Sequence, residues 1–467
     1  MPSKSQLKTG RLALVKPLAV ALIVLGLGTL AVFGLPKTNK KPGLTCSGKP
    51  CNVILIVADT LAAKHMSLYG YERETTPFLD EFFGKEGIVF ENAWSNASWT
   101  VPSFISFFTS RLPSDAYVER IEDSLSESIP TFLDILRDEG VQLQYFHVTP
   151  FLLANRGVLE EFSPEERVGT LDPLLVYAAG DWIRAQEEGS NKKPYFALIH
   201  TYLVHDPYDP PEKYRTLFDG PVQYPGPVFD GTMFQAMRQP GGPTAAQVER
   251  YTRQYDQEIR FLDDVLKDFF SDLPPSTLDN SIVILMADHG EGFWEHGRFL
   301  HGNSVYEELT HVPFLLRVPG APSRRISEPM SLIDLAPTLL DLHGTDRPPS
   351  FQGKSLLSVL KGDPLDEQRP QAESTDVQWP GKQEFATLQT VVRTARIDIP
   401  RDRAIRVGPW KLISTLTGQL EFYNLETDPA EKNNLLSRWQ QLSEPDRNKT
   451  ADLFEALDVP SPKLQSE

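Results

Sequence analysis

One stretch, residues 281–308, constrains the fold of this chain more than any other. Its first part, residues 281–287, is a continuous apolar run rich in β-branched side chains. Such a run is typical of a strand buried on both faces, as in a parallel sheet that helices cover. The run ends abruptly in Asp-His-Gly-Glu at 288–291. Because ligands of open α/β sheets bind just beyond the carboxyl ends of strands, the position of this tetrapeptide predicts a site.

The residues of this stretch are suited to a divalent cation. Asp288 and His289 offer a carboxylate oxygen and an imidazole nitrogen side by side. His296 and His301 follow in a Gly-rich loop, so three of the nine histidines of the chain fall in this region. A surface loop with a capping aspartate and solvated histidines is the alternative for these residues alone.

The same pattern recurs elsewhere in the chain. Residues 53–58 form another continuous apolar run, and this run ends in Asp59. A third run, residues 195–200, leads into a Pro-rich loop that places His205 beyond the strand end. A single aspartate after a strand is commonplace as a turn former. Two buried strands that both end in acidic residues are less common, which weakens the alternative that these aspartates only cap or form turns.

A hydroxyl group is expected at a helix start in residues 96–111. Pro102 suits the first turn of a helix, and the pattern after it continues helically, so Thr100 lies at or just before the N-terminus. Free backbone N–H groups and the helix dipole favour an anion there, including a hydroxyl that has lost its proton. A simple N-cap role for Thr100 or Ser103 is the alternative.

Length and charge limit the class of protein. A chain of 467 residues implies one large α/β domain with an appendage, or two domains. The net charge of -17 argues against nucleic-acid binding, which needs a basic face. Further elements are expected as helices at 77–87, 251–270 and 331–342, as strands at 88–90 and 312–318, and as a small antiparallel sheet within 404–435.

The N-terminal region predicts a membrane anchor. Residues 17–36 contain no charged side chain, and as a helix they would be roughly 30 Å long, which matches a bilayer core. The flanking basic residues weakly favour a short cytoplasmic tail, so the following domain is expected to be periplasmic or extracellular. A cleaved signal peptide is the alternative, but no clear cleavage site closes the apolar run. Cys46 and Cys51 could close a small disulfide loop in an oxidising compartment, or stay as two unpaired thiols.

The order and the sequences of these segments resemble those of the sulfatase family of the alkaline phosphatase superfamily. The likeness runs in order over residues 52–436 and is carried by NVILIVADTL (52–61), LYGY (68–71), TPFLD (76–80), WTVPS (99–103), TSR (109–111), HDPY (205–208), DHGE (288–291), EHG (295–297), VPF (312–314), DLAPT (334–338), FYNLETDP (422–429) and NL (434–435). The resemblance implies an alkaline phosphatase-like α/β fold with a large, mostly parallel mixed sheet between helices. It also implies a smaller C-terminal domain of antiparallel strands with a helix.

The N-terminal apolar run and the resemblance together suggest a division of the chain into domains. In order, these are a short tail (1–16), the transmembrane anchor (17–36), a linker (37–51), the catalytic α/β domain (52–345), a C-terminal subdomain (346–445) and a tail (446–467).

The resemblance also implies a one-metal site. Asp59, Asp288 and His289 would hold one divalent cation, and the nucleophile, Thr100, would be bound to it. The identity of the cation stays open among Ca²⁺, Mn²⁺, Mg²⁺ and Zn²⁺.

Three further histidines would lie towards the substrate. The resemblance implies that His205 and His301 bind the oxyanion and protonate the leaving group. His301 stands where many sulfatases carry a lysine. His296 is expected either to contact the substrate or to support the residues that do.

The chain departs from the sulfatase pattern at the nucleophile. Sulfatases proper carry a Cys or Ser that is converted to formylglycine, within Cys/Ser-x-Pro-x-Arg. Here the segment 100–104 is Thr-Val-Pro-Ser-Phe, so both the convertible residue and the arginine are missing and no formylglycine is expected. Thr60 stands where many members have a second metal-binding aspartate. These features look more like the phosphodiesterases and phospholipid-headgroup transferases of the superfamily.

Three functions remain compatible with the sequence. The first is a membrane-anchored, metal-dependent hydrolase of phosphate- or sulfate-type esters that uses Thr100, and its substrate stays unidentified. The second is a transferase that moves a phosphoryl headgroup onto an envelope lipid or polymer. The third is a catalytically inactive relative that serves as a binding module, which is disfavoured because all four metal-site positions carry competent side chains. Within the first, a threonyl ester must be cleaved by in-line attack, which favours phosphorus over sulfur.

Overall fold

The computed structural model describes residues 45–46, 49–116, 124–148, 162, 167–169, 172–189, 193–218, 240–361, 402–415 and 417–457. Contacts divide the chain into Met1–Lys41 and Pro42–Glu467, and the fold described below is that of the second unit. The expected anchor at 17–36 lies outside the described residues. Within the described ranges, no helix combines the length and the apolar character needed to cross a bilayer.

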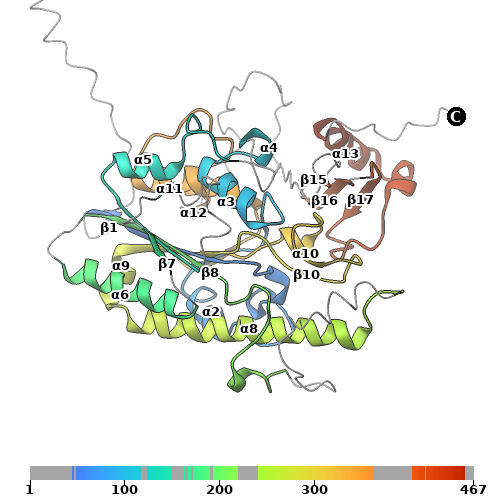
Figure 1. The fold of residues 1–467 in the computed structure, drawn as a ribbon. Coiled ribbons are helices and arrows are strands. Elements are labelled where there is room, and N and C mark those ends of the chain that lie inside the picture. Colours follow the sequence, from blue (N-terminus) through green and yellow to red (C-terminus); the bar gives the residue numbers. More distant parts are fainter. Residues whose placement is uncertain are drawn as a thin grey trace, which may run out of the picture. The chain divides into compact units, whose positions relative to one another are not determined.

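An eight-stranded mixed sheet forms the centre of the large domain (Figure 1). Its strands, in spatial order, are β13 (Arg324–Ile326), β4 (Ile88–Phe90), β12 (Phe314–Arg317), β9 (Ser281–Met286), β3 (Asn52–Ala58), β8 (Tyr195–Thr201), β6 (Gln142–His147) and β7 (Arg167–Gly169). The run from β9 to β7 is parallel, whereas β12 is antiparallel to both of its neighbours. The predicted large, mostly parallel mixed sheet is therefore confirmed.

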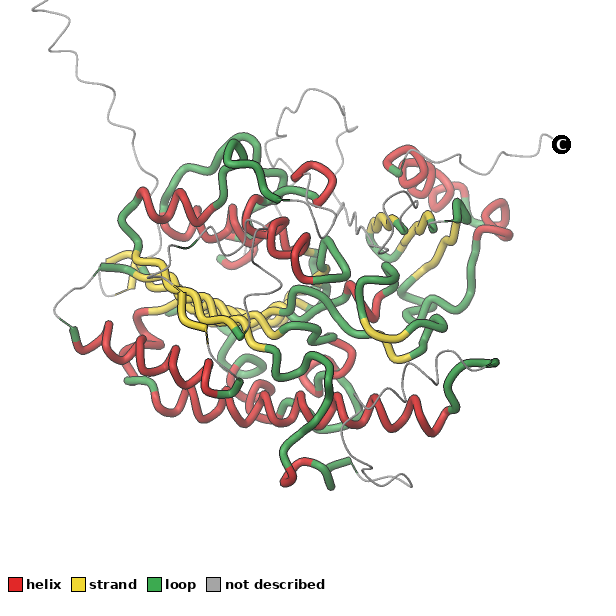
Figure 2. Tube along the Cα trace, in the orientation of Figure 1, coloured by secondary structure: helices red, strands yellow, loops and turns green. Residues whose placement is uncertain are grey.

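Helices cover both faces of this sheet (Figure 2). One layer contains α2 (Pro77–Phe82), α6 (Leu174–Glu188), α8 (Ala245–Asp272) and α9 (Pro275–Asn280), and the other contains α3 (Thr100–Thr109), α5 (Phe132–Asp138), α11 (Leu335–His343) and α12 (Leu357–Leu360). Every residue of β8 and β9 is buried, which explains why these strands are apolar throughout instead of alternating.

Two predicted helices differ from the observed ones in their ends. The helix expected over 77–87 ends at Phe82, because the chain turns tightly at Gly84, where an added Cβ would lie 2.2 Å from the Asp80 carbonyl oxygen. The helix expected from residue 251 begins earlier, at Ala245, because Thr244 and Gln247 form a capping box that stabilises an additional N-terminal segment.

Strand register brings the predicted site residues to one edge of the sheet. Val57 pairs with Met286 on β9, and Ala58 pairs with Thr201 on β8. The three strands therefore end at the same level, and the residues that follow them meet there. This edge is the carboxyl end of the parallel strands, where ligands bind in open α/β sheets.

A second, smaller sheet belongs to the C-terminal subdomain. It consists of β15 (Arg403–Val407), β16 (Trp410–Ser414) and β17 (Leu420–Asn424), all antiparallel, as predicted. Helix α13 (Glu444–Ala456) packs on this sheet and buries Leu453 and Phe454 with Trp410. Much of the region expected as a tail from residue 446 is thus a helix of the subdomain.

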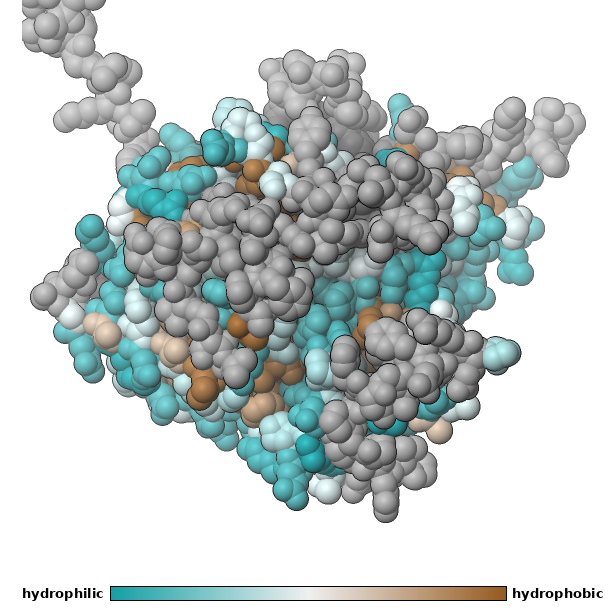
Figure 3. All heavy atoms as spheres, in the orientation of Figure 1, coloured by the Kyte–Doolittle hydropathy of each residue, from teal (hydrophilic) through white to brown (hydrophobic). Residues whose placement is uncertain are grey.

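Large hydrophobic side chains lie almost entirely inside the described part of the molecule. Among the described residues, only Leu174 and Tyr177 are large hydrophobics that are exposed. The coloured surface in Figure 3 is mostly hydrophilic, with small and separate hydrophobic areas.

Candidate metal centre and active site

Three of the predicted metal ligands converge beyond the ends of β3 and β9. Asp59, Asp288 and His289 each offer a ligand atom, and these atoms lie within 4.8 Å of one another. The Nε2 atom of His289 is 3.4 Å from Asp59 Oδ1 and 3.4 Å from Asp288 Oδ2. All three side chains are fully buried. The strand register thus places three residues that are far apart in sequence around one point.

The donor atoms of these three residues fit a divalent cation. Asp59 Oδ1 and Asp288 Oδ2 are buried atoms for which no hydrogen-bond partner exists among the described residues. Burying a carboxylate oxygen without a partner is costly unless a ligand satisfies it. His289 Nδ1 lies 3.0 Å from the Gly290 carbonyl oxygen, so it carries the proton and its Nε2 lone pair faces the two orphaned oxygens. Two carboxylates with one unprotonated imidazole nitrogen form a normal ligand set for such an ion.

The protonation equilibria of these residues reflect two acids held close together. Burial raises the pKa of Asp288 well above its usual value, and the charge of Asp59 raises it further. Burial alone would also raise the pKa of Asp59, but the hydrogen bond from His200 and the nearby His289 lower it overall. Burial lowers the pKa of His289 to about 3, which keeps its ring neutral.

Thr100 lies directly against these ligands. It is the first residue of α3, and its predecessor Trp99 occupies the N-cap position without a side-chain capping bond. Thr100 Oγ1 is 3.3 Å from Asp59 Oδ2 and 3.4 Å from His289 Nε2. The alternative N-cap role of Thr100 is therefore not observed. Ser103 points elsewhere and donates to the Asp288 carbonyl oxygen at 2.7 Å.

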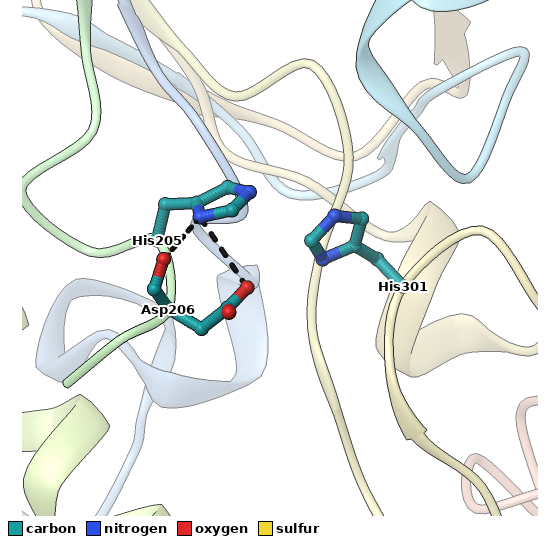
Figure 4. Close-up of side chains that lie close together, drawn as sticks. All are labelled: His205, Asp206 and His301. Atoms are coloured by element: carbon teal, nitrogen blue, oxygen red, sulfur yellow. Dashed lines mark hydrogen bonds and ion pairs between the residues drawn. The ribbon is translucent and has the colours of Figure 1, made fainter. Parts of the chain in front are cut away.

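His205 and His301 form the next layer of the site (Figure 4). Their ring centroids are 4.9 Å apart, and the ring of His301 lies 4.6 Å from that of His289. Burial, together with the nearby His205, lowers the pKa of His301 to about 4. Burial opposes the charged form of His205 as well, but Asp59 and Asp206 raise its pKa overall. The structure therefore brings both predicted histidines next to the candidate metal ligands.

The structure does not bring His296 to this site. Its ring stacks on Tyr306 with centroids 3.6 Å apart. Its Nδ1 atom lies 2.7 Å from Glu308 Oε1, and its Nε2 atom lies 3.2 Å from the Glu431 carbonyl oxygen. Both ring nitrogens are thus occupied by protein partners. Of the two roles considered, the geometry fits a supporting residue and not a substrate contact.

Thr60 does not act as a substitute for a second metal-binding aspartate. Its hydroxyl donates to the Val204 carbonyl oxygen at 2.9 Å, and its backbone has φ 63°. This bond ties the end of β3 to the loop that carries His205.

Three residues that the sequence reasoning did not assign also belong to the site. His200 Nε2 donates to Asp59 Oδ2 at 3.0 Å and accepts from the Tyr145 hydroxyl through Nδ1 at 3.2 Å. Glu291 is fully buried and accepts from the Tyr208 hydroxyl at 2.7 Å, and Asp206 adjoins His205. The only sequence signal for His200 was its position as a polar residue at the end of the apolar run 195–200. The only signal for Asp206 and Glu291 was that they stand in the motifs HDPY (205–208) and DHGE (288–291).

This arrangement defines a class of protein: an α/β protein that places a threonine hydroxyl against a candidate metal site at the carboxyl edge of its sheet. The comparisons with known proteins specify the class further. The Sulfatase family matches residues 51–345, and the family described as N-sulphoglucosamine sulphohydrolase, C-terminal, matches residues 294–450. The chain belongs to the sulfatase family and is an ester hydrolase of that family.

Individual relatives are distant but cover most of the chain. The Delta 4,5-hexuronate-2-O-sulfatase of Bacteroides thetaiotaomicron is 24% identical over an alignment of 429 residues that covers 82% of this chain and 84% of that protein. A structure solved in complex with its substrate D-glucosamine-2-N,6-O-disulfate has a TM-score of 0.67 at 19% identity, covering 88% of this chain and 97% of that one. The phosphonate monoester hydrolase of Agrobacterium radiobacter has a TM-score of 0.66 at 18% identity, covering 87% and 95%. At these identities the two structures show a shared fold.

Proposed function

We propose that this protein is a membrane-anchored, metal-dependent hydrolase that uses Thr100 as its nucleophile and prefers phosphate- or phosphonate-type esters to sulfate esters. The observation that carries the proposal is the position of Thr100 Oγ1, 3.3 Å from Asp59 and 3.4 Å from His289, beside two orphaned carboxylate oxygens. A divalent cation held by Asp59, Asp288 and His289 would lower the pKa of the adjacent Thr100 hydroxyl and neutralise the oxygens of the transferred group.

The preference for phosphorus follows from the chemistry of a threonine ester. Thr100 Oγ1 bonds to phosphorus while the bond to the leaving oxygen breaks, and water then displaces Oγ1 in line. A formylglycine hydrate can expel sulfate by eliminating to the aldehyde, because it carries a second hydroxyl on the same carbon. Thr100 carries none, so both steps must be displacements at the central atom, and phosphoryl groups undergo these readily when their charge is neutralised.

The residues around Thr100 are suited to hold that charge. The N-terminus of α3 has no side-chain cap, so its first backbone N–H groups and its dipole favour an anion at this point. His205 and His301 face the same space and would stabilise the oxygens on the substrate side. The fold shared with a phosphonate monoester hydrolase is consistent with this chemistry.

The proposed location rests on two features near the N-terminus. The apolar residues 17–36 are long enough to anchor the chain in a bilayer. Cys51, the last residue of the expected linker, is disulfide-bonded, and Cys46 is the only other cysteine of the chain. Disulfides persist in oxidising compartments, which supports a catalytic domain outside the cytoplasm. Carbonate extraction of full-length protein and sequencing of its mature N-terminus test the anchor, and a mature N-terminus near residue 36 would overturn it.

The nucleophile is tested with three aryl substrates that share one leaving group: a phosphodiester, a phosphonate monoester and a sulfate. The wild-type enzyme should turn over the two phosphorus esters faster than the sulfate. Thr100→Ala should reduce kcat/KM by roughly 10³-fold or more, whereas Thr100→Ser should keep a measurable part. Thr109→Ser is the matched control, because it removes the same methyl group from the same helix at a residue that only bonds Ile105. Efficient sulfate hydrolysis that survives Thr100→Ala would overturn both the nucleophile and the phosphorus preference.

A further inference from the structure

The segment that carries His205 is a short loop directly after β8, and main-chain bonds fix its course. The Asp59 N–H donates to the Thr201 carbonyl oxygen at 3.0 Å, and the His205 N–H donates to the Tyr202 carbonyl oxygen at 3.0 Å. These bonds hold the backbone of the loop beside the candidate metal centre. They do not fix the orientation of the His205 side chain, because that depends on contacts of the imidazole ring itself.

The ring of Tyr202 lies flat against the ring of His205. Their centroids are 4.9 Å apart, and the angle between the ring planes is 16°. The Nδ1 atom of His205 lies 2.6 Å from the Asp206 carbonyl oxygen, whereas its Nε2 atom forms no hydrogen bond with any described residue. The stacked ring fixes the plane of the imidazole, and the contact at Nδ1 fixes its rotation within that plane. Nε2 is thereby left on the side of the ring away from Asp206 (Figure 4).

Tyr202 is held in turn by Asp172, which lies earlier in the chain, just before α6. One carboxyl oxygen of Asp172 accepts the Tyr202 N–H at 2.7 Å, and the other accepts the Thr201 hydroxyl at 2.9 Å. The Tyr202 hydroxyl, by contrast, has no hydrogen-bond partner in the part of the chain that the structure describes. Tyr202 therefore contributes to the loop through its backbone anchor and through the face of its ring, and not through its hydroxyl.

We propose that Tyr202 is a positioning residue for His205, and that Asp172 anchors Tyr202 in this role. The proposal rests on the proposed function and deepens it, since His205 is expected to protonate the leaving group of the ester. A general acid must lie within hydrogen-bond reach of the leaving oxygen, about 2.6–3.2 Å between heavy atoms. A misplacement of about 1 Å can cost roughly 10²-fold in rate. Because only poor leaving groups need a proton, the ring of Tyr202 determines which leaving groups the enzyme can expel.

Tyr202 also touches His200, but this contact does not explain its position. The two ring centroids are 5.0 Å apart, with 69° between the ring planes. His200 is already bonded at both of its ring nitrogens, to Asp59 and to the Tyr145 hydroxyl. These two bonds orient His200 without Tyr202, so loss of the Tyr202 ring should leave metal binding unchanged. Metal content therefore separates an effect on His205 from a general disturbance of the site.

The kinetic test compares two esters that differ only in their leaving group. Full-length protein in detergent is assayed with the phenyl and the para-nitrophenyl ester of whichever acid group wild type turns over fastest. Tyr202→Leu should lower kcat/KM for the phenyl ester by roughly 10- to 100-fold, and for the para-nitrophenyl ester far less. Tyr202→Phe keeps the ring and should retain most of the activity with both esters. Equal losses with the two esters, or a Tyr202→Phe variant as impaired as Tyr202→Leu, would overturn the proposal.

A double variant shows whether Tyr202 acts through His205. His205→Ala should lower kcat/KM for the phenyl ester by roughly 10²-fold or more, and adding Tyr202→Leu should cause little further loss. Asp172→Asn removes one of the two acceptors and should lower it by roughly 2- to 13-fold. Tyr177→Leu, the same change at an exposed tyrosine of α6, is the control and should match wild type. Additive losses in the double variant would overturn the proposal.

Crystal structures and metal content test the same proposal without turnover. The His205 ring should have one orientation in wild type and in Tyr202→Phe, and more than one in Tyr202→Leu, while all three proteins hold the same amount of metal. A single, unchanged orientation in Tyr202→Leu, or a loss of metal from it, would overturn the proposal. Thr100→Ala should keep the single orientation while it loses turnover, so failure of this proposal and failure of the proposed nucleophile give different results.

Discussion

Two groups of buried carboxylates in this molecule are neutralised in different ways. Under the C-terminal sheet, Lys411 is fully buried and lies 2.9 Å from Glu307 and 2.9 Å from Glu431, and Arg406 lies 3.0 Å from Glu307. At the active site, Asp59 and Asp288 have histidines as their only ionisable partners among the described residues.

The pKa values show the consequence of this difference. Burial opposes ionisation of Glu307, but Lys411 and Arg406 together lower its pKa to about 2. Burial and a neighbouring carboxylate instead raise the pKa of Asp288. Glu431 shares Lys411 with Glu307, yet burial raises its pKa to about 7. The C-terminal group therefore receives a buried lysine and an arginine from the protein, whereas Asp59 and Asp288 have neither among the described residues. Buried acids without a lysine or arginine are therefore a stronger sign of a metal site than acids alone.

The largest effect on activity should appear when a carboxylate is removed from the candidate metal centre. Asp288→Asn keeps the shape and the acceptor for the His289 N–H but removes the charge, so it should lower activity by roughly 10²–10³-fold or more. Removing one of two repelling acids should leave the metal-free protein at least as stable as wild type. Activity, metal content and thermal melting in chelator measure these effects. Metal retained at wild-type stoichiometry would remove Asp288 from the site.

The opposite result is expected when the cation of the C-terminal group is removed. Lys411→Met leaves Glu307 and Glu431 buried without their shared partner, which should cost about 3–5 kcal/mol of unfolding free energy. Urea unfolding measures this cost. Lys85→Met, at an exposed lysine paired with Glu81, is the control and should change the free energy by less than about 1 kcal/mol. Equal losses of unfolding free energy in the two variants would show that the buried ion pairs of Lys411 stabilise the protein no more than an exposed ion pair does.

The C-terminal group should also make stability depend on acid pH. Because the folded pKa of Glu307 is depressed to about 2, its contribution is present above the unfolded pKa of about 4.3 and is lost as pH falls towards 2. Unfolding free energies between pH 5 and pH 3 should therefore decline less steeply in Glu307→Gln than in wild type. Parallel declines in the two proteins would mean that other carboxylates cause the acid sensitivity.

The smallest effect should come from the hydrogen bonds behind the metal ligands. Tyr145→Phe removes the donor to His200, which in turn orients Asp59. Losing one neutral hydrogen bond costs about 0.5–1.5 kcal/mol, so metal affinity should fall by roughly 2- to 13-fold while KM for the ester changes little at saturating metal. Tyr195→Phe, which removes a hydroxyl from the far end of β8, is the control. If only thermal stability changed and metal affinity stayed the same, Tyr145 would contribute to packing but would not help to orient Asp59 through His200.

The sequence predicts the centre of this molecule well and its periphery less well. Buried parallel strands need apolar residues on both faces, so β3, β8 and β9 are visible as continuous runs, and Asp59 and Asp288 are found as their ends. The support of His296 by Glu431, by contrast, joins residues far apart in the chain, and no local pattern encodes it. Asp206 and Glu291 stand inside recognisable motifs, but their roles depend on which histidine the fold places beside them. The end of a helix, such as that of α2 at Phe82, depends on the geometry of the following turn. The spacing of hydrophobic residues does not predict this geometry.

The hairpin formed by β10 (Gly292–Phe293) and β11 (Phe299–Leu300) connects the candidate metal centre with the C-terminal subdomain. Its tip reaches the C-terminal subdomain, where Lys432 bonds the Glu295 carbonyl oxygen and Glu431 accepts from His296. Its return strand ends next to His301, beside the metal ligands. The first matching family covers the whole hairpin, and the second begins at residue 294, directly after β10, and covers the tip and β11. A catalytic domain expressed alone would keep Asp59, Asp288 and His289 but lose the contacts from Glu431 and Lys432 that hold the hairpin next to His301. The hairpin therefore belongs structurally to both domains.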